Sequence, residues 1–162
     1  MRTTRLLVSL VAPVVTATLA VAACGSSGGD ADNLSKGQFA AKANDLCSKA
    51  DAARAPLLQQ LQPTPSGSAD SQNLQRAAGI DRELLRDVDA LVPPAAKQDS
   101  VDRLLDAWRQ RADVEDEYAV AVELTQDAQT LAGFTANLAQ IDATAAPIAN
   151  QLGMNECARG AS

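Results

Sequence analysis

The sequence contains no histidine, and its aromatic residues amount to one tryptophan, one tyrosine and two phenylalanines. Without histidine, the Ser-His-Asp and Cys-His arrangements of nucleophilic catalysis are excluded, as are most transition-metal and haem sites. A ferritin-like di-iron site in its usual form needs Glu-x-x-His, so that site is excluded too. Because aromatic side chains are scarce and alanine is common, each helix can bury only a modest apolar area.

Glycine-rich phosphate-binding loops are also missing, as are the alternating apolar runs and Asn-Gly turns typical of β-strands and hairpins. Lysine and arginine total 14 against 20 aspartates and glutamates, which gives a formal net charge of −6. No basic stripe remains for a nucleic acid to bind. We therefore identify no catalytic residue, and we expect a protein that is not an enzyme and has no nucleic-acid partner.

The N-terminus does carry a signal for export. Arg2 and Arg5 precede an apolar run over residues 6–21, which is short and is interrupted by Ser9, Pro13 and two threonines. That arrangement is typical of a signal peptide rather than of a transmembrane helix.

Residues 19–24, LAVAAC, follow the apolar run and resemble a bacterial lipobox. In a lipobox the cysteine is lipidated and becomes the first residue of the mature protein. The resemblance implies a thioether-linked diacylglycerol on Cys24, and two acyl chains suffice for stable anchoring. No other cofactor is expected. The alternative is an ordinary secretory signal in which Cys24 is incidental.

The chain is thus predicted to have three parts: a lipoprotein signal peptide at 1–23, the lipidated cysteine and a flexible Gly/Ser-rich linker at 24–35, and a helical domain at 36–162. The mature part has 12 basic and 20 acidic residues, a net charge of −8. An anionic membrane surface would repel it within about 10 Å. We expect the domain to lie on the extracytoplasmic face of the cell membrane, where lipid rather than charge holds it.

Two cysteines remain once Cys24 is assigned to lipid. Cys47 and Cys157 form an even pair in an oxidising compartment, and we predict a disulfide between them. In the chain-entropy model, a closed loop of about 100 residues stabilises a domain by roughly 4.7 kcal/mol. The alternative is two separate buried thiols.

Helical periodicity is strong along the rest of the chain. Ser35 and Gln38 match a capping box that would begin the first helix. Pro56 should kink that helix or divide it in two. The second helix is expected to start near Asp70 or Ser71, and two prolines at 93 and 94 end it, with a third helix just after them. The apolar seam of the first helix reads Phe39, Ala43, Leu46, Ala50, Ala53, Leu57 and Leu61.

The third and fourth helices carry apolar seams of the same kind. Glu115 falls on the seam of the third helix. Either its side chain snorkels outward, or the buried face of the helix is rotated toward Val114 and Tyr118. The fourth helix has the most regular seam, with spacings of three and four residues: Leu131, Phe134, Leu138, Ile141, Ala145, Ile148 and Leu152. Pro147 predicts a bend within it, and Gly153 a C-cap.

Short loops between these segments predict an all-α fold, an up-down-up-down four-helix bundle with kinked first and fourth helices, stapled by the disulfide. The first and fourth helices would then be antiparallel neighbours, which brings Cys157 toward Cys47. Cys47 lies two to three turns into its helix. Either the first turns of that helix project past the fourth, or the tail after Gly153 runs alongside.

The two ends of the mature domain carry recognisable motifs. Residues 43–47, ANDLC, and residues 152–157, LGMNEC, resemble a pattern of small secreted and lipid-anchored helical proteins of actinobacteria. The resemblance leaves out the middle of the chain. It implies the same disulfide and bundle, and it brings no established activity.

Three groups of residues are weighed as possible binding sites. Asp113, Asp116 and Glu117 share one helical face and could attract Ca²⁺, but a straight helix supplies few convergent ligands, so we expect a solvated face and no metal. Trp108 and Tyr118 could line a ligand pocket, although filling the core is the favoured interpretation. Asn44 is placed to cap or bridge helices.

These observations favour a membrane-anchored extracytoplasmic lipoprotein without catalytic activity. It would be an interaction or structural module of the cell envelope that contacts another, unidentified envelope component. The alternative is a carrier or sensor of a small apolar ligand held between the helices, because an alanine-rich, proline-kinked bundle can leave a cavity.

Overall fold

The computed structural model describes residues 34–125 and 127–159. The predicted signal peptide, Cys24 and most of the predicted linker lie outside these residues. Within the described part the chain is helical and contains no strand. No helix there is both long enough and apolar enough to cross a bilayer.

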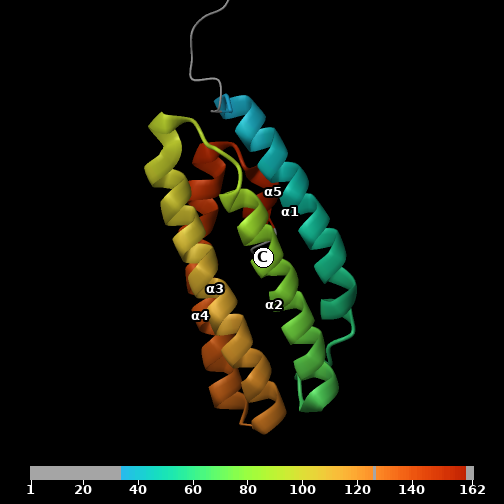
Figure 1. The fold of residues 1–162 in the computed structure, drawn as a ribbon. Helices are drawn as coiled ribbons and strands as arrows, with labels where there is room; N and C mark the ends of the chain where they lie inside the picture. The colour runs from blue at the N-terminus through green and yellow to red at the C-terminus, as the bar shows by residue number, and fades with distance from the viewer. Residues whose placement is uncertain (1–33, 126, 160–162) are drawn as a thin grey trace, which may run out of the picture.

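Four long helices pack against one another in chain order (Figure 1). They are α1 (Lys36–Gln59), α2 (Gly67–Asp89), α3 (Gln98–Leu124) and α4 (Ala128–Leu152), and a short 3-10 turn, η1 (Ala95–Lys97), precedes α3. α1 packs on α2, α2 on α3, and α3 on α4. The all-helical class and the four long helices that the sequence predicts are therefore confirmed.

A fifth helix, α5 (Asn155–Arg159), joins the two ends of the domain. It packs on both α4 and α1. The predicted direct packing of the first helix on the fourth is wrong, because α1 packs mainly on α2, α4 packs mainly on α3, and α5 connects the two. Of the two arrangements that the sequence allows for the C-terminal end, the one in which the tail after α4 runs alongside α1 is present.

Local hydrogen bonds explain where the helices begin. At the start of α1, the Ser35 hydroxyl accepts from the Gln38 N–H, and the Gln38 side chain accepts from the Ser35 N–H, so the predicted capping box is confirmed. α2 begins at Gly67, earlier than predicted, because the Asp70 carboxylate accepts the Ser66 N–H at 2.8 Å and closes an extra turn. α1 continues through Pro56 without being divided.

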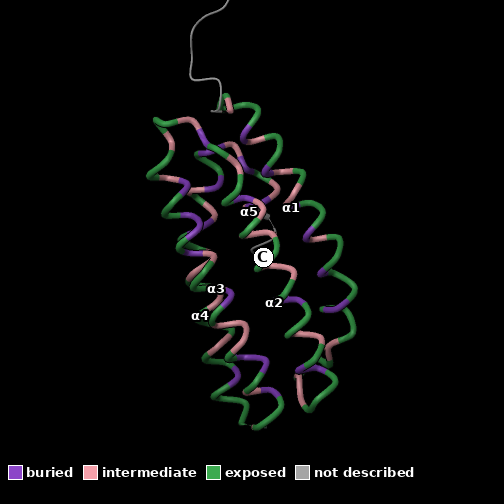
Figure 2. Tube along the Cα trace, in the orientation of Figure 1, coloured by how far each residue is buried: buried purple, intermediate pink, exposed green. Residues whose placement is uncertain are grey.

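Buried positions recur along the length of the helices (Figure 2), and two apolar clusters stand out among the residues that occupy them. The larger lies at the α5 end and draws residues from every helix, with Phe39, Val101, Leu104, Leu152 and Met154 almost fully buried. The smaller surrounds Tyr118, Val122 and Leu131 near the α3–α4 turn. The predicted seam of the first helix is wrong at two positions, since Ala53 is exposed while its neighbour Arg54 is buried, and Leu61 lies beyond the end of α1 at Gln59. The bundle thus turns a charged residue of α1 inward.

Gly153 is predicted to tolerate substitution poorly. It ends α4 with φ 82°, in the left-handed region, as the sequence predicts for a C-cap. A side chain there costs about 1–2 kcal/mol, so Gly153→Ala should lower the free energy of unfolding by that amount in urea denaturation. Gly79, in the middle of α2, is the matched control, because a methyl group added there would meet open space. Gly79→Ala should raise stability by about 0.5–1 kcal/mol, and equal effects of the two changes would contradict the capping role.

Candidate functional site

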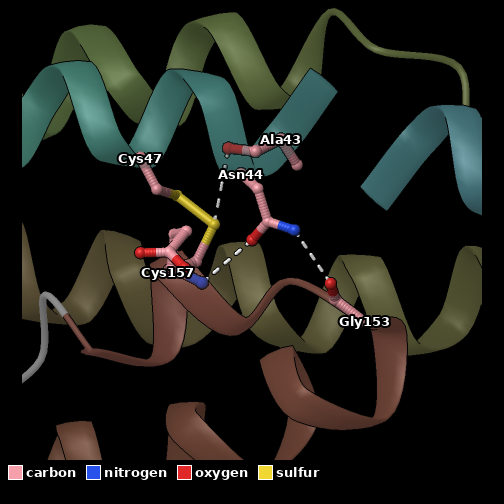
Figure 3. The surroundings of a disulfide bond; sticks show 6 residues. Ala43, Asn44, Cys47, Gly153 and Cys157 are labelled. Atoms are coloured by element: carbon pink, nitrogen blue, oxygen red, sulfur yellow. Dashed lines mark hydrogen bonds between the residues drawn. A yellow bond between two sulfur atoms is a disulfide. The ribbon is translucent and has the colours of Figure 1, made fainter. Parts of the chain in front are cut away.

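The predicted disulfide joins α1 to α5. Cys47 and Cys157, 110 residues apart in the chain, are bonded with their Cα atoms 5.1 Å apart. Both are buried, and the Sγ of Cys157 lies 3.6 Å from the Ala43 carbonyl oxygen (Figure 3). The bond therefore fixes the C-terminal end of the domain to the first helix.

Asn44, one turn before Cys47 on α1, reinforces the same junction. Its Nδ2 donates to the Gly153 carbonyl at 2.9 Å, and its Oδ1 accepts from the Glu156 N–H at 2.9 Å (Figure 3). One side chain thus satisfies a carbonyl at the end of α4 and an N–H at the start of α5. Asn44 therefore bridges helices, which is one of the two roles considered for it from the sequence. The short motifs at the two ends of the domain, residues 43–47 and 152–157, meet at this point.

A layer of charged side chains lies between the two apolar clusters. It contains Arg54 from α1, Asp81 from α2, Arg111 and Glu115 from α3, and Asp142 from α4. Each of these side chains is only 11–14% exposed. On α3, core residues precede and follow the two charged positions, which shows that the layer interrupts the core rather than flanking it. We name these five residues the charged layer.

Arg111 is the centre of the charged layer. Its Nη1 lies 3.1 Å from Asp81, its Nη2 3.0 Å from Glu115, and its Nε 3.0 Å from Asp142. Arg54 reaches Asp81 at 3.2 Å and Glu115 at 3.9 Å. The side chains of all four long helices are therefore linked through one set of ion pairs.

The charged layer holds three carboxyl groups and two guanidinium groups, so it would carry one excess negative charge if every carboxyl were ionised. A proton on one carboxyl group removes that excess. Burial raises the pKa of Glu115 to about 8, and the charge of Asp81 and a hydrogen bond to it add to the effect. Burial also raises the pKa of Asp142, despite Arg111 beside it. For Arg111, burial lowers the pKa but the surrounding carboxylates outweigh it, so the pKa is raised. At neutral pH, Glu115 is therefore mostly protonated and Arg111 is charged.

A small cavity of about 40 Å³ adjoins the charged layer and is partly open to solvent. Asp51, Asp81, Asp142 and Trp108 line it, together with both arginines of the layer and the disulfide. Asp51 is half-buried on α1, and burial is the main reason that its pKa is raised. This is the place in the described part of the chain where a cavity, ionisable groups with shifted pKa values and an aromatic ring coincide, which marks it as the candidate site.

The aromatic residues weighed from the sequence have separate roles. Tyr118 belongs to the smaller apolar cluster and packs against Phe134 with ring centroids 5.8 Å apart, so it fills the core. Trp108 packs partly against the larger cluster and also lines the cavity. The two residues lie on either side of the charged layer and do not form one pocket.

The acidic run 113–117 is divided between surface and interior. Asp113 and Glu117 are exposed, and Asp116 pairs with Arg82 of α2. Glu115 points into the charged layer rather than snorkelling. Among the described residues, no group of three or more acidic or cysteine side chains is arranged to hold a metal ion.

Sequence reasoning missed most of the charged layer. Arg54, Asp81, Arg111 and Asp142 carry no pattern that singles them out, whereas Glu115 stands out as a misfit on an apolar seam. The positions of two of the others along their helices could have indicated burial. Arg54 lies four residues after Ala50 and three before Leu57, which places it on the same helical face, and Asp142 directly follows Ile141 of the fourth seam. A buried glutamate at mid-helix calls for opposite charges at the same height on its neighbours.

Removing the disulfide should destabilise the domain. We expect the double variant Cys47→Ala/Cys157→Ala to lose roughly 3–5 kcal/mol of the free energy of unfolding, because a closed loop of this length restricts the unfolded chain. Urea denaturation followed by circular dichroism measures the loss. Reduction of the disulfide in the native protein should have a similar effect. A loss of less than about 1 kcal/mol in the free energy of unfolding would contradict a stabilising role for the disulfide.

Glu115 should make stability fall as pH rises. The folded protein keeps a proton on Glu115 that the unfolded chain releases above its ordinary pKa of 4.5, so stability declines between pH 4.5 and about 8. Glu115→Gln stays neutral and should flatten this decline, most clearly at pH 6–8. Thermal melts across that range measure the effect.

Glu117→Gln is the matched control, since Glu117 is an exposed glutamate two residues along the same helix. It should leave the pH dependence of the wild type unchanged. A Glu115→Gln variant that retains the full decline would show that the buried carboxyl is not its source.

Comparison of the chain with protein-family models, with characterised proteins and with solved structures gives no match. The function is therefore inferred from the residues of the chain and their arrangement.

Proposed function

We propose that the protein is a lipid-anchored, extracytoplasmic module of the cell envelope that acts by binding a partner rather than by catalysis. The observation that carries the proposal is the Cys47–Cys157 disulfide. A buried disulfide suits an exported protein, because the cytosol keeps thiols reduced. It also accounts for two of the three cysteines in the chain, so that Cys24, at the end of the lipobox-like segment, is left for lipid.

The start of the folded domain supports a short tether. Leu34 donates its N–H to the Val92 carbonyl at 3.2 Å, and Ser35 caps α1. The segment between Cys24 and these residues is about ten residues long, which gives a root-mean-square span of roughly 17 Å. Such a tether keeps the domain close to the bilayer despite its net negative charge.

The proposal includes the finer topology that the sequence predicts, an up-down-up-down four-helix bundle bent at Pro56 and Pro147. Two observations support it. Consecutive long helices pack side by side, and both prolines lie inside helices, where a proline removes one backbone hydrogen bond and its ring crowds the preceding turn.

The end of the domain that lies opposite Ser35 suits contact with a partner. α3 ends there at Leu124, whose side chain is 78% exposed, the largest exposure among the large apolar side chains of the described residues. Val120, one turn earlier, is 49% exposed. An anchored module would present this end away from the membrane (Figure 1). By contrast, the charged lining of the 40 Å³ cavity does not favour the alternative of an apolar-ligand carrier.

The anchor is tested by changing Cys24 in the full chain, expressed in a bacterium that processes lipoproteins. The wild-type protein should partition with membranes, and its N-terminal peptide should carry the mass of a diacylglycerol. Cys24→Ala should lose the lipid and appear in the soluble extracytoplasmic fraction, because the thioether needs the thiol. Mass spectrometry and fractionation measure both.

Ser26→Ala, two residues along, is the matched control and should behave as the wild type does. Equal membrane association of Cys24→Ala and wild type, or an unmodified N-terminal peptide in the wild type, would refute the anchor.

A further inference from the structure

We propose that the cavity beside the charged layer binds a small organic cation with N–H donors, such as a primary ammonium or a guanidinium group. This site is separate from the proposed anchor and from the distal apolar end. The proposal rests on which hydrogen-bonding groups around the cavity are already paired, on its charge and on its size.

The cationic groups that line the cavity are largely occupied. All three nitrogens of the Arg111 guanidinium lie within 3.1 Å of a carboxyl oxygen, although the contact from its Nε to Asp142 is not aligned as a hydrogen bond. Arg54 is paired with Asp81 through its Nη1 at 3.2 Å, its Nη2 lies 3.9 Å from the Glu115 carboxyl, and its buried Nε lacks a hydrogen-bond partner. An anionic ligand would therefore have to displace existing carboxylates, so the arginines do not form an anion site.

The carboxylates have acceptor capacity to spare. Within the described chain, Asp51 makes no hydrogen bond and no ion pair within 4 Å, although Arg54 influences its pKa. Asp142 has one ion pair, to the Arg111 Nε, and its buried Oδ1 has no well-aligned hydrogen bond. These two carboxylates belong to α1 and α4 and line the same cavity. They can accept from a ligand with several N–H donors.

The net charge of the side chains around the cavity also favours a cationic ligand. With Glu115 protonated, the lining carboxylates of Asp51, Asp81 and Asp142 face two guanidinium groups, an excess of one negative charge. One monovalent cation neutralises that excess. Burial raises the pKa of both Asp51 and Asp142, although Arg54 and Arg111 act to lower it.

The size and the wall of the cavity restrict the ligand. A volume of about 40 Å³ holds roughly three water-sized groups, enough for an ammonium or methylammonium head but not for a bulky quaternary ammonium. Trp108 lines one side, and an indole face attracts cations. Carboxylates and an aromatic ring together are a typical environment for an organic cation.

Trp108 provides the measurement, because it is the single tryptophan of the chain. The purified full chain is titrated with methylammonium chloride while its fluorescence is recorded, and sodium chloride keeps the ionic strength constant. We expect a saturable change in Trp108 emission. Tetramethylammonium chloride, which has no N–H donor and is larger, should cause none, and sodium acetate should cause none.

Asp51→Asn and Asp142→Asn should each weaken methylammonium binding about tenfold or more, since each removes a charged acceptor. Asp113→Asn, the same change at an exposed position of α3, is the matched control and should bind as the wild type does. Circular dichroism establishes that each variant is folded. If Asp142→Asn does not fold, Asp51→Asn decides the matter, because Asp51 is half-exposed and outside the ion pairs.

Two results would overturn the proposal. One is the absence of a saturable fluorescence change with methylammonium at constant ionic strength, which would mean that the cavity holds water alone. The other is an affinity in folded Asp51→Asn equal to that of Asp113→Asn, which would place the bound cation elsewhere.

Discussion

Arg111 holds three helices together from inside the bundle, and the arrangement of the domain depends on that set of ion pairs. Its carboxylate partners Asp81 and Asp142 come from α2 and α4, the protonated carboxyl of Glu115 on α3 itself lies 3.0 Å from it, and Arg54 extends the set to α1. Breaking a buried ion pair by removing one partner typically costs about 3–5 kcal/mol, because the other charge is left uncompensated. The helices must therefore pack in the one register that places these side chains at the same height. Apolar residues of similar size could often replace such a layer without loss of stability. What the layer adds is the common register of the four helices and a charged border to the cavity.

The disulfide and Asn44 compensate for the modest core that such a layer leaves. The core is rich in alanine and poor in aromatic residues, and the charged layer divides it into two clusters. At the larger cluster, Cys47 and Asn44 secure α5 and the end of α4 to α1. α5 closes the space between the first and fourth helices at that end, and the disulfide lies over the cavity that the charged layer borders. The Cys47–Cys157 disulfide, α5 and the charged layer therefore form one structural unit.

Much of this structure could be predicted from the sequence, because most of its signals are local. The capping box at Ser35, the glycine C-cap at Gly153 and the apolar seams depend on neighbours within a few residues, and the structure contains them apart from Ala53 and Leu61 of the first seam. The disulfide followed from the number of cysteines and the predicted export. α5 was not predicted as a helix, since five residues carry little periodicity. The charged layer was missed because its members lie on different helices, and only Glu115 looked out of place. Arg54 and Ala53 are adjacent on α1, so a small rotation of the helix decides which of the two is buried. Packing against α2 and α5 sets that rotation, and no local pattern contains it.

The central claim is that the interior layer holds more carboxyl groups than guanidinium groups and keeps one of them protonated. The most direct measurement is a pH titration of the full chain by NMR, with the side-chain carboxyl carbons of glutamate labelled with ¹³C and Glu115 assigned through the Glu115→Gln variant. We predict a midpoint of about 8 for Glu115. A midpoint near 4.5, the ordinary value for this side chain, would contradict the claim. Glu115 would then be ionised at neutral pH, and the layer would hold three carboxylates against two guanidinium groups.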